Sequence, residues 1–441
     1  MKKSVRQSAF DILFKVERSG AYSNLALDSE LENNSESSQD SAFLTALVYG
    51  TLERLITIDY NLSLYLKQPL KKLKPEVLIA LRLGTYQILF MDKVPERAAV
   101  NESVQLVKNN RAAFASGLVN AVLRNIAKNG LRFPNSDNEI YNMSVRFSFP
   151  EWIVQLWSNA YGTDTAFKLL EAMSKRAPIN IRVNTQKVST DELIELLKSE
   201  GVESKTIDWL PDALELVSPG AVENLRSYND GLFHVQDLSS QLCCATLAPK
   251  PNERVFDMCA APGGKSFTLS QLMESKGDLL SFDIYDSRLA LIESGAKRLG
   301  LNNIRVASNN AAEFNSELGM ADKVLCDVPC SGLGVIRRKP EIRYKQPADI
   351  DKLPQIQYDI LCSCSKYVNN GGKLVYSTCS INPAENAEVC ERFLAEHKNF
   401  KAIKTLPELP QRFEGDEKYL TLMPHINGTD GFFIASFIRT E

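Results

Sequence analysis

The stretch Arg254-Val-Phe-Asp-Met-Cys-Ala-Ala-Pro-Gly-Gly-Lys265 decides the fold of the C-terminal half of this chain. It predicts a short apolar strand, a glycine turn and the start of a helix. Gly263 and Gly264 carry no Cβ, so the backbone can turn sharply there and approach a ligand. The N–H groups at the start of the helix would then face that ligand. This order of elements predicts a ligand site at the carboxyl edge of an open parallel sheet.

Strands and helices continue to alternate after this stretch. Strands are predicted at 279–284, 303–307, 323–326, 373–376 and 432–438, and helices at 287–299, 353–368 and 383–396. Such alternation is typical of an α/β protein with a mostly parallel, doubly wound sheet.

Asp283 lies at the end of the strand predicted at 279–284, at the spacing from Gly264 at which an acidic residue can hold ribose hydroxyls. The pattern therefore indicates a nucleotide cofactor, and NAD is one alternative. The loop lacks G-x-G-x-x-G, however, and Pro262 makes it a different turn. A glycine turn without any ligand is the other alternative.

The N-terminal part has a different pattern. Apolar positions recur at helical spacing from residue 4 to about 129, which predicts an all-α domain. Asn and Ser residues with Gly130 and Pro134 then suggest a linker. We predict domains at 1–130 (all-α), 131–150 (linker), 151–235 (small α+β subdomain) and 236–441 (catalytic domain).

Composition excludes several classes of protein. The chain has 441 residues, a formal net charge of -3 and nine cysteines. No segment approaches the length of uncharged sequence that a membrane span needs, and Asp11 and Lys15 interrupt the apolar residues near the N-terminus. An odd number of cysteines without a signal sequence fits a reducing compartment, so we expect a cytoplasmic protein. Three scattered histidines argue against a histidine-rich metal site.

Two cysteines follow apolar strands directly and should lie at the carboxyl edge of the sheet. Cys330 stands in Asp327-Val-Pro-Cys-Ser-Gly332, and Cys379 stands in Tyr376-Ser-Thr-Cys-Ser380. Asn382-Pro-Ala-Glu385 then predicts a helix start beside Cys379, which would lower the pKa of that thiol. The pair lacks the further ligands that a zinc site requires.

The commoner role of a lone cysteine is that of a small buried hydrophobe. We assign this role to Cys243, Cys244, Cys326, Cys362, Cys364 and Cys390. Cys259 is expected to line the cofactor loop without taking part in chemistry.

These motifs together resemble the Fmu/Sun family of RNA cytosine-C5 methyltransferases, which use S-adenosylmethionine. The resemblance is carried by Cys259-Ala-Ala-Pro-Gly-Gly-Lys265 and the two cysteine motifs, with Arg182-Val-Asn184 and Val235-Gln-Asp237 as flanking signatures. The helical N-terminus resembles the NusB-like RNA-binding domain of the bacterial 16S rRNA subgroup. The resemblance implies a Rossmann-like methyltransferase domain preceded by an all-α NusB-like domain and a small α+β segment.

The resemblance also implies roles for the reactive residues. Cys379 corresponds to the nucleophile that adds to C6 of cytosine, and Cys330 to the thiol that assists product release. By analogy with DNA cytosine methyltransferases these roles would be reversed, and the sequence leaves both assignments open. Asp327 is expected to hydrogen-bond the cytosine edge and to lie near the cofactor, while Lys265 contacts the substrate or orients Asp327.

The cofactor-binding residues implied by the family are those of the glycine turn and of three strand ends. Asn310 stands where the family usually has Asp, and its carbonyl oxygen can still accept from the adenine amine. The set is Cys259, Ala260, Ala261, Pro262, Gly263, Gly264, Lys265, Asp283, Asn310 and Asp327.

The substrate implied by the resemblance is 16S rRNA, either naked or in a partly assembled small subunit. The basic run Arg337-Arg-Lys-Pro-Glu-Ile-Arg-Tyr-Lys345 is a candidate for phosphate contacts, with Tyr344 stacking on a base. A solvated charged face is the alternative for this run. A tRNA cytosine-C5 methyltransferase and a non-catalytic RNA-binding or antitermination factor are the competing functions. We expect a monomer, with neither a membrane nor a metal as partner.

Overall fold

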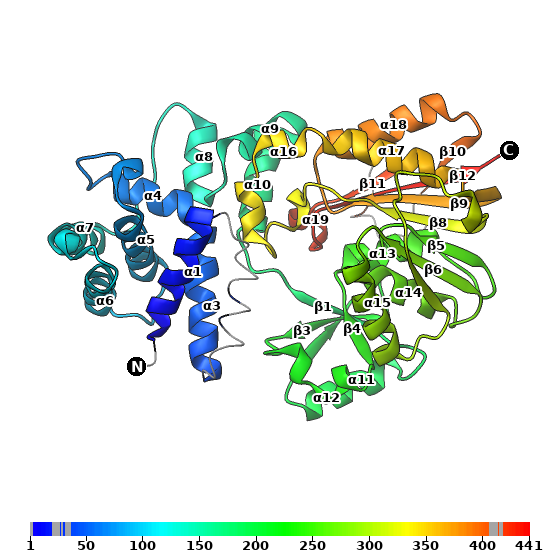
Figure 1. The fold of residues 1–441 in the computed structure, drawn as a ribbon, viewed down its shortest axis with the longest axis horizontal. Coiled ribbons are helices and arrows are strands. Elements are labelled where there is room, and N and C mark those ends of the chain that lie inside the picture. The colour runs from blue at the N-terminus through cyan, green and yellow to red at the C-terminus, as the bar shows by residue number, and fades with distance from the viewer. Residues whose placement is uncertain (1–2, 20–26, 28–29, 31–36, 405–412, 414–417) are drawn as a thin grey trace. The chain divides into compact units, whose positions relative to one another are not determined.

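The computed structural model describes residues 3–19, 27, 30, 37–404, 413 and 418–441 (Figure 1). The chain divides into two compact units, each with its own hydrophobic core. Unit 1 comprises Met1–Ser174 and Lys339–Lys345, and unit 2 comprises Lys175–Arg338 and Gln346–Glu441.

Unit 1 is helical, as predicted. Its helices are α1 (Val5–Ser19), α3 (Ser38–Glu53), α4 (Leu55–Ser63), α5 (Pro75–Phe90), α6 (Glu96–Asn109), α7 (Ser116–Asn129), α8 (Glu139–Phe147), α9 (Glu151–Tyr161) and α10 (Thr163–Met173). Short 3-10 turns accompany them at η1 (Leu70–Lys72), η2 (Ala113–Ala115) and η6 (Pro340–Tyr344).

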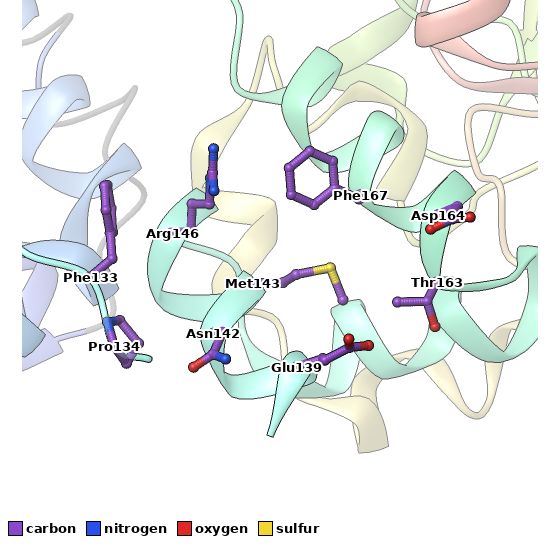
Figure 2. A pocket seen from close by; sticks show the side chains of 9 residues that line it. All are labelled: Phe133, Pro134, Glu139, Asn142, Met143, Arg146, Thr163, Asp164 and Phe167. Atoms are coloured by element: carbon purple, nitrogen blue, oxygen red, sulfur yellow. The ribbon is translucent and has the colours of Figure 1, made fainter. Parts of the chain in front are cut away.

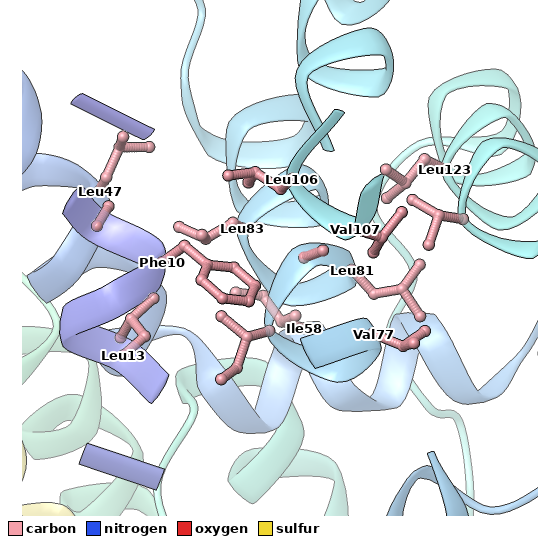
Figure 3. Close-up of a cluster of buried hydrophobic side chains, with 14 of the residues drawn as sticks. Phe10, Leu13, Leu47, Ile58, Val77, Leu81, Leu83, Leu106, Val107 and Leu123 are labelled. Carbon is pink, nitrogen blue, oxygen red and sulfur yellow. The ribbon is translucent and has the colours of Figure 1, made fainter. Parts of the chain in front are cut away.

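Helix α5 is the central helix of this unit and packs against α1, α3, α4, α6 and α7. Figure 3 shows the core around it, which includes Phe10, Leu13, Leu47, Leu81, Leu106 and Val107. Gly84 of α5 allows this close packing, because a Cβ there would lie 2.5 Å from Leu123 Cδ1 and 2.5 Å from Ser103 Oγ. Each fully buried leucine contributes roughly 1.5–3 kcal/mol through removal of its surface from water.

The predicted linker at 131–150 is wrong in part, because it contains α8. Asn138 caps this helix by accepting a hydrogen bond from the N–H of Tyr141, and Met143, Val145 and Phe147 are buried. The polar residues that suggested a linker therefore include a helix cap. Residue 132 is also held, because Asn61 binds both the N–H and the C=O of Arg132.

The segment Lys339–Lys345 follows a strand of unit 2 in sequence but packs within unit 1. Arg343 is 1% exposed and donates hydrogen bonds to Glu53 O at 2.7 Å and to Ser148 O at 3.2 Å. Its guanidinium lies over the ring of Phe149, 4.1 Å from the centroid. The predicted phosphate-binding role of Arg343 is therefore wrong. The neighbouring Tyr344 also binds within the unit, because its hydroxyl donates a hydrogen bond to Leu52 O. Charge pattern alone cannot separate a solvated arginine from one that anchors a loop.

Replacing Arg343 with alanine is expected to destabilise the protein by about 2 kcal/mol, because two buried carbonyls lose their donor and Phe149 loses its cover. Urea unfolding followed by circular dichroism measures this change. Lys339→Ala is the matched control, since Lys339 is exposed in the same segment. Equal stability of the Arg343 variant and the control would contradict the anchoring role.

No single helix in the described part of the chain is long and apolar enough to cross a membrane. The helices Gln39–Glu53 and Leu55–Ser63 are long and apolar enough only when taken together, and they are bent by 70° at the break between them. The apolar residues of this pair, among them Leu47, Val48 and Ile58, lie in the core of unit 1.

Unit 2 begins at Lys175, inside the α+β segment predicted at 151–235, because residues 151–174 form α9 and α10 and belong to unit 1. Its strands β1 (Ile179–Val183), β2 (Glu203–Thr206), β3 (Ala213–Val217) and β4 (Phe233–Val235) form an antiparallel sheet in the order β2-β3-β1-β4. The helices α11 (Thr190–Ser199) and α12 (Arg226–Asn229) connect them. Ser189 and Glu192 start α11 with a capping box.

The second sheet has the order β10-β12-β9-β8-β5-β6-β7, and β11 pairs with β12. Its strands are β5 (Arg254–Asp257), β6 (Asp278–Asp283), β7 (Ile304–Ser308), β8 (Ala321–Asp327), β9 (Val368–Thr378), β10 (Phe400–Ile403), β11 (Tyr419–Leu422) and β12 (Phe432–Arg439). The strands from β9 to β7 are parallel, whereas β12 runs antiparallel to β9. The predicted doubly wound sheet is confirmed. Its order reverses beside β5, and ligands bind at such a switch point.

Helices cover both faces of this sheet. They are α13 (Leu238–Leu247), α14 (Gly264–Leu272), α15 (Asp286–Leu299), α17 (Leu353–Ser365) and α18 (Ala387–Glu396). Two short helices, α16 (Pro347–Ile350) and α19 (Pro424–Asn427), lie in connections between strands. Successive strand residues enter opposite cores: Val324 and Cys326 pack with α17, whereas Leu325 packs with α13. The predicted core cysteines lie in these two clusters, with Cys362 only partly buried.

Candidate active site

The two cysteine motifs lie side by side at the carboxyl edge of the second sheet. Strands β8 and β9 are parallel, and their register places Asp327 opposite Ser377. Ser377 Oγ donates a hydrogen bond to Asp327 Oδ1 at 2.8 Å. Each strand ends here, so the loops that carry Cys330 and Cys379 start from adjacent points.

The loops bring the two thiols into direct contact, with 3.1 Å between Cys330 Sγ and Cys379 Sγ. Gly334 makes this approach possible, because its N–H donates to Cys379 O at 2.9 Å. A Cβ on Gly334 would lie 2.9 Å from that same oxygen and closer still to the backbone of Gly431. The sequence predicted both thiols at one edge, and the structure brings them together.

The hydrogen bond to Cys379 and burial raise the pKa of the Cys330 thiol well above its usual range, and the negative charges of Glu385 and Asp327 add to this effect. Cys330 is therefore a neutral thiol at physiological pH. A neutral thiol is a poor nucleophile but can donate a hydrogen bond or a proton.

Lys265 and Asp327 form an ion pair that joins the glycine turn to the cysteine motifs. Lys265 Nζ lies 2.6 Å from Asp327 Oδ2 and 5.2 Å from the centroid of the Phe432 ring. Burial alone would lower the pKa of Lys265, but the carboxylate of Asp327 outweighs it and raises the pKa above the usual value. Lys265 is therefore positively charged and holds the side chain of Asp327 in a fixed orientation.

The predicted helix start beside Cys379 is wrong in its extent. Asn382 does act as a cap, because its Oδ1 accepts from the N–H of Ala384 at 3.2 Å, but the cap belongs to the 3-10 turn η7 (Pro383–Glu385). The α-helix α18 begins only at Ala387, after a break at Asn386. One 3-10 turn has too few aligned peptide units for the proposed effect on a thiol.

The glycine turn contains two glycines with different roles. Gly263 has φ 109°, and a Cβ there would lie 2.6 Å from the ring of Phe267, so the fold itself requires glycine. Gly264 begins α14, and the nearest atom to a Cβ there is Gln236 Nε2 at 3.9 Å. Packing within the chain therefore does not require glycine at position 264, whereas a ligand lying against the turn would.

The other predicted cofactor residues lie at the ends of neighbouring strands. Asp283 ends β6 and is 5% exposed, and its Oδ1 accepts from the N–H of Tyr285 at 3.1 Å. Arg288 lies 3.5 Å from its other oxygen. Asn310 follows β7, and its Oδ1 already accepts from the N–H of Ala312 at 3.2 Å. Since an amide oxygen has two lone pairs, this bond leaves one for an adenine amine.

Two buried carboxylates beside the site were not singled out from the sequence. Asp257 ends β5, and burial raises its pKa to about 7, although Ser266 Oγ donates to it at 2.7 Å. Glu385 is fully buried and binds Ser331 and Ser380, the residues that directly follow the two thiols. The motif Asn-Pro-Ala-Glu contained Glu385, but it resembled a helix start and so concealed this role.

A cavity of about 420 Å³ lies elsewhere, in unit 1, between α8 and α10 (Figure 2). Its lining includes Phe133, Met143, Arg146 and Phe167, none of which belongs to the predicted catalytic or cofactor residues. The guanidinium of Arg146 lies over the Phe167 ring, 5.3 Å from its centroid. This cavity is distinct from the candidate active site.

A doubly wound sheet, a glycine turn at its switch point and two thiols in contact at the same edge define an enzyme that combines a nucleotide cofactor with cysteine chemistry. Comparison with protein families specifies the class. Residues 244–438 match the 16S rRNA methyltransferase RsmB/F model, residues 3–128 match the NusB family, and residues 149–223 match the ferredoxin-like domain of RsmF/B-like methyltransferases.

Individual relatives match over almost the whole chain. The chain is 39% identical to the probable ribosomal RNA small subunit methyltransferase B of Bacillus subtilis (strain 168), covering 99% of this chain and 98% of that protein. It is 34% identical to the corresponding protein of Synechocystis sp., covering 98% and 99%. A solved structure described as the crystal structure of PH0851 aligns with a TM-score of 0.81 at 27% identity, covering 99% of this chain and 100% of that one.

The chain belongs to the RsmB/F family of 16S rRNA methyltransferases, which depend on S-adenosylmethionine. The predicted family, fold class, enzyme class and cofactor are thereby confirmed. NAD, the alternative that the strand spacing left open, is excluded by this membership.

Replacing Gly264 with valine is expected to weaken binding of S-adenosylmethionine at least about tenfold, because the branched side chain occupies the space against the turn. Equilibrium dialysis with labelled cofactor measures the affinity without requiring RNA or turnover. Gly117→Val in α7 is the control, since a Cβ there meets nothing within 4 Å. Unchanged cofactor affinity of the Gly264 variant would contradict the assignment of this turn.

Proposed function

We propose that the chain transfers a methyl group to C5 of a specific cytosine in 16S rRNA, with Cys379 attacking C6 of the base and Cys330 assisting release. The observation that carries this proposal is the contact of two thiols, 3.1 Å apart, beside the Lys265–Asp327 ion pair. Two thiols can divide attack and release between them, which a single cysteine cannot do.

Cytosine C5 is a weak nucleophile. When Cys379 Sγ forms a bond to C6, the electron density of the ring moves to C5, which can then accept a methyl group. S-adenosylmethionine, when bound, supplies that methyl group in electrophilic form. A general base then takes the C5 proton, the electrons of the C5–H bond re-form the C5–C6 double bond, and the Sγ–C6 bond breaks, which returns the thiolate of Cys379.

Asp327 is the group proposed to hold the cytosine edge. Both of its oxygens already accept hydrogen bonds, Oδ1 from Ser377 and Oδ2 from Lys265, so the carboxylate has a fixed orientation. Each oxygen keeps a lone pair with which it can accept from the cytosine amine or from a protonated N3. Lys265 acts through Asp327 in this proposal.

We further propose that the cofactor lies against residues 259–265, with Asp283 on the ribose and Asn310 on the adenine. Residues 1–130 would serve as an RNA-binding domain and 236–441 as the catalytic domain. The proposed enzyme acts as a cytoplasmic monomer on 16S rRNA, naked or partly assembled. The target base must be unstacked, which costs a few kcal/mol and is cheapest in a loop.

The proposal is tested by incubating the full chain with unmethylated 16S rRNA and S-adenosylmethionine, followed by bisulfite sequencing. One cytosine of 16S rRNA should become resistant to conversion. Unmodified tRNA serves in a parallel reaction. Methylation of tRNA but not of 16S rRNA would support the tRNA alternative, and absence of methylation from both would support a non-catalytic RNA-binding factor.

A further inference from the structure

Glu385 is a buried carboxylate that accepts hydrogen bonds from both cysteine loops, at Ser331 and at Ser380. We propose that Glu385 is a positioning residue, which sets the separation of Cys330 and Cys379 through Ser331 and Ser380. This inference rests on the proposed division of attack and release between the two cysteines.

The Cys330 loop is held to Glu385 by the residue that follows the thiol. Ser331 N donates to Glu385 Oε2 at 2.7 Å, and Ser331 Oγ donates to Oε1 at 2.6 Å. Both bonds come from one residue, so they fix the position and the orientation of the loop. Gln357 also connects Glu385 to this loop, because its Nε2 donates hydrogen bonds to Glu385 Oε2 and to Pro329 O, both at 3.0 Å.

The Cys379 loop is held to the same carboxylate in the same way. Ser380 Oγ donates to Glu385 Oε1 at 2.8 Å and lies 2.9 Å from Ser331 Oγ. Ser331 and Ser380 directly follow the two cysteines. The Cα atom of each serine therefore lies only about 3.8 Å from the Cα atom of the preceding cysteine. One carboxylate oxygen, Oε1, thus joins the two loops next to the reactive sulfurs.

The carboxylate is itself held firmly. Tyr376 OH donates to the backbone oxygen of Glu385 at 2.6 Å, and Asn386 Nδ2 donates to Ser380 O at 3.0 Å. Glu385 is therefore tied to β9 by its own backbone oxygen, and the side chain of the next residue, Asn386, binds the Cys379 loop.

The chemistry of this carboxylate favours a role in geometry over one in general stability. Among the residues that the structure describes, no lysine or arginine forms an ion pair with Glu385, and its hydrogen-bond donors Ser331, Ser380 and Gln357 are neutral. Burying such a charge is costly, and apolar residues of similar volume would often stabilise a core equally well. Charge-assisted hydrogen bonds are short and directional, which suits a group that must hold two loops in register.

The test compares Glu385→Gln, Ser331→Ala and Ser380→Ala with Glu388→Gln, an exposed glutamate in the first turn of α18. Rates are expressed per enzyme competent to bind S-adenosylmethionine, so a misfolded fraction does not count. Glu385→Gln should lower kcat about 100-fold, the cost of misplacing reacting groups by roughly 1 Å, while the affinity for the cofactor stays unchanged. Glu388→Gln should retain the wild-type rate.

Two further measurements report on the thiols directly. Phenylarsine oxide bridges two nearby thiols with loss of water, and its reaction with the Cys330–Cys379 pair should be slower in all three variants of the Glu385 cluster. Ser331→Ala should accumulate a covalent protein–RNA adduct, because its loop carries the release thiol. Ser380→Ala should form less adduct than the wild type, because its loop carries the attacking thiol. Cys330→Ala serves as the blank for the arsenical.

The two serine variants keep the test decisive if Glu385→Gln does not fold. The inference would be overturned if the variants of Glu385, Ser331 and Ser380 kept the wild-type kcat per competent enzyme and reacted normally with phenylarsine oxide. A lower Tm alone would show that Glu385 has only a structural role. In that case the proposed function stands, provided that Cys379→Ser is inactive. If the Cys379→Ser enzyme were active, that result would contradict both the proposed function and this inference.

Discussion

Replacing Cys379 with serine is expected to abolish methylation of 16S rRNA, with a loss in initial rate on the order of 10⁴-fold or more. A thiol ionises far more readily than a serine hydroxyl, and the thiolate is the nucleophile that can add to C6. The change replaces one atom in a partly buried side chain, so the fold should persist. Methyl incorporation from labelled S-adenosylmethionine measures the rate.

The control for this prediction is Cys362→Ser, which removes a partly buried thiol from α17 in the same unit. It should methylate at the wild-type rate. The Cys379 variant should also form no covalent adduct with RNA on a denaturing gel. If the Cys379 variant accumulated adduct instead, the roles of the two thiols would be reversed, as the analogy with DNA cytosine methyltransferases suggests.

The sequence predicted the architecture of unit 2 because the signals were local. A continuous apolar run such as Val324, Leu325 and Cys326 marks a strand that is buried on both faces, and the two cores lie as this pattern requires. Asp327 and Cys330 then followed from the position of the strand end. Such predictions need only the chain's own periodicity and the geometry of a parallel sheet.

The errors arose where a local signal had two physical meanings. Asn138 was counted among linker residues, yet the same side chain caps α8. Arg343 belonged to a basic run, but its guanidinium binds backbone carbonyls from residues far away in sequence. In each case the deciding partner lies in another element, so the sequence pattern could not distinguish between the two meanings.

Glu385 illustrates the limit for the site itself. Its partner Ser331 lies 54 positions earlier in the chain, so no short motif contains the hydrogen bonds that matter. The family motifs identified the thiols and Lys265, but the contact of 3.1 Å between the sulfurs depends on this long-range arrangement. Motifs thus supplied the reacting groups, and tertiary structure supplied their geometry.

Replacing Cys330 with alanine is expected to trap the enzyme on its RNA, because the Cys379–C6 bond forms but is not resolved. Cys330 is the thiol to which the proposal assigns release, and its hydrogen bond to Cys379 and its burial raise its pKa. Its sulfur contacts that of Cys379, so it lies close to the bond that must break. Denaturing gels with unmethylated 16S rRNA should show a stable complex and about one turnover or less per enzyme.

The double variant Cys330→Ala with Cys379→Ser separates trapping from ordinary tight binding. Trapping requires a sulfur at position 379, so the double variant should form no complex that survives denaturation, although it should still bind RNA under native conditions. A complex that persisted in the double variant would show that another residue bonds to the base. Because alanine leaves only a small space at position 330, a fall in Tm comparable to that of Arg343→Ala would point to damaged packing rather than to a lost release step.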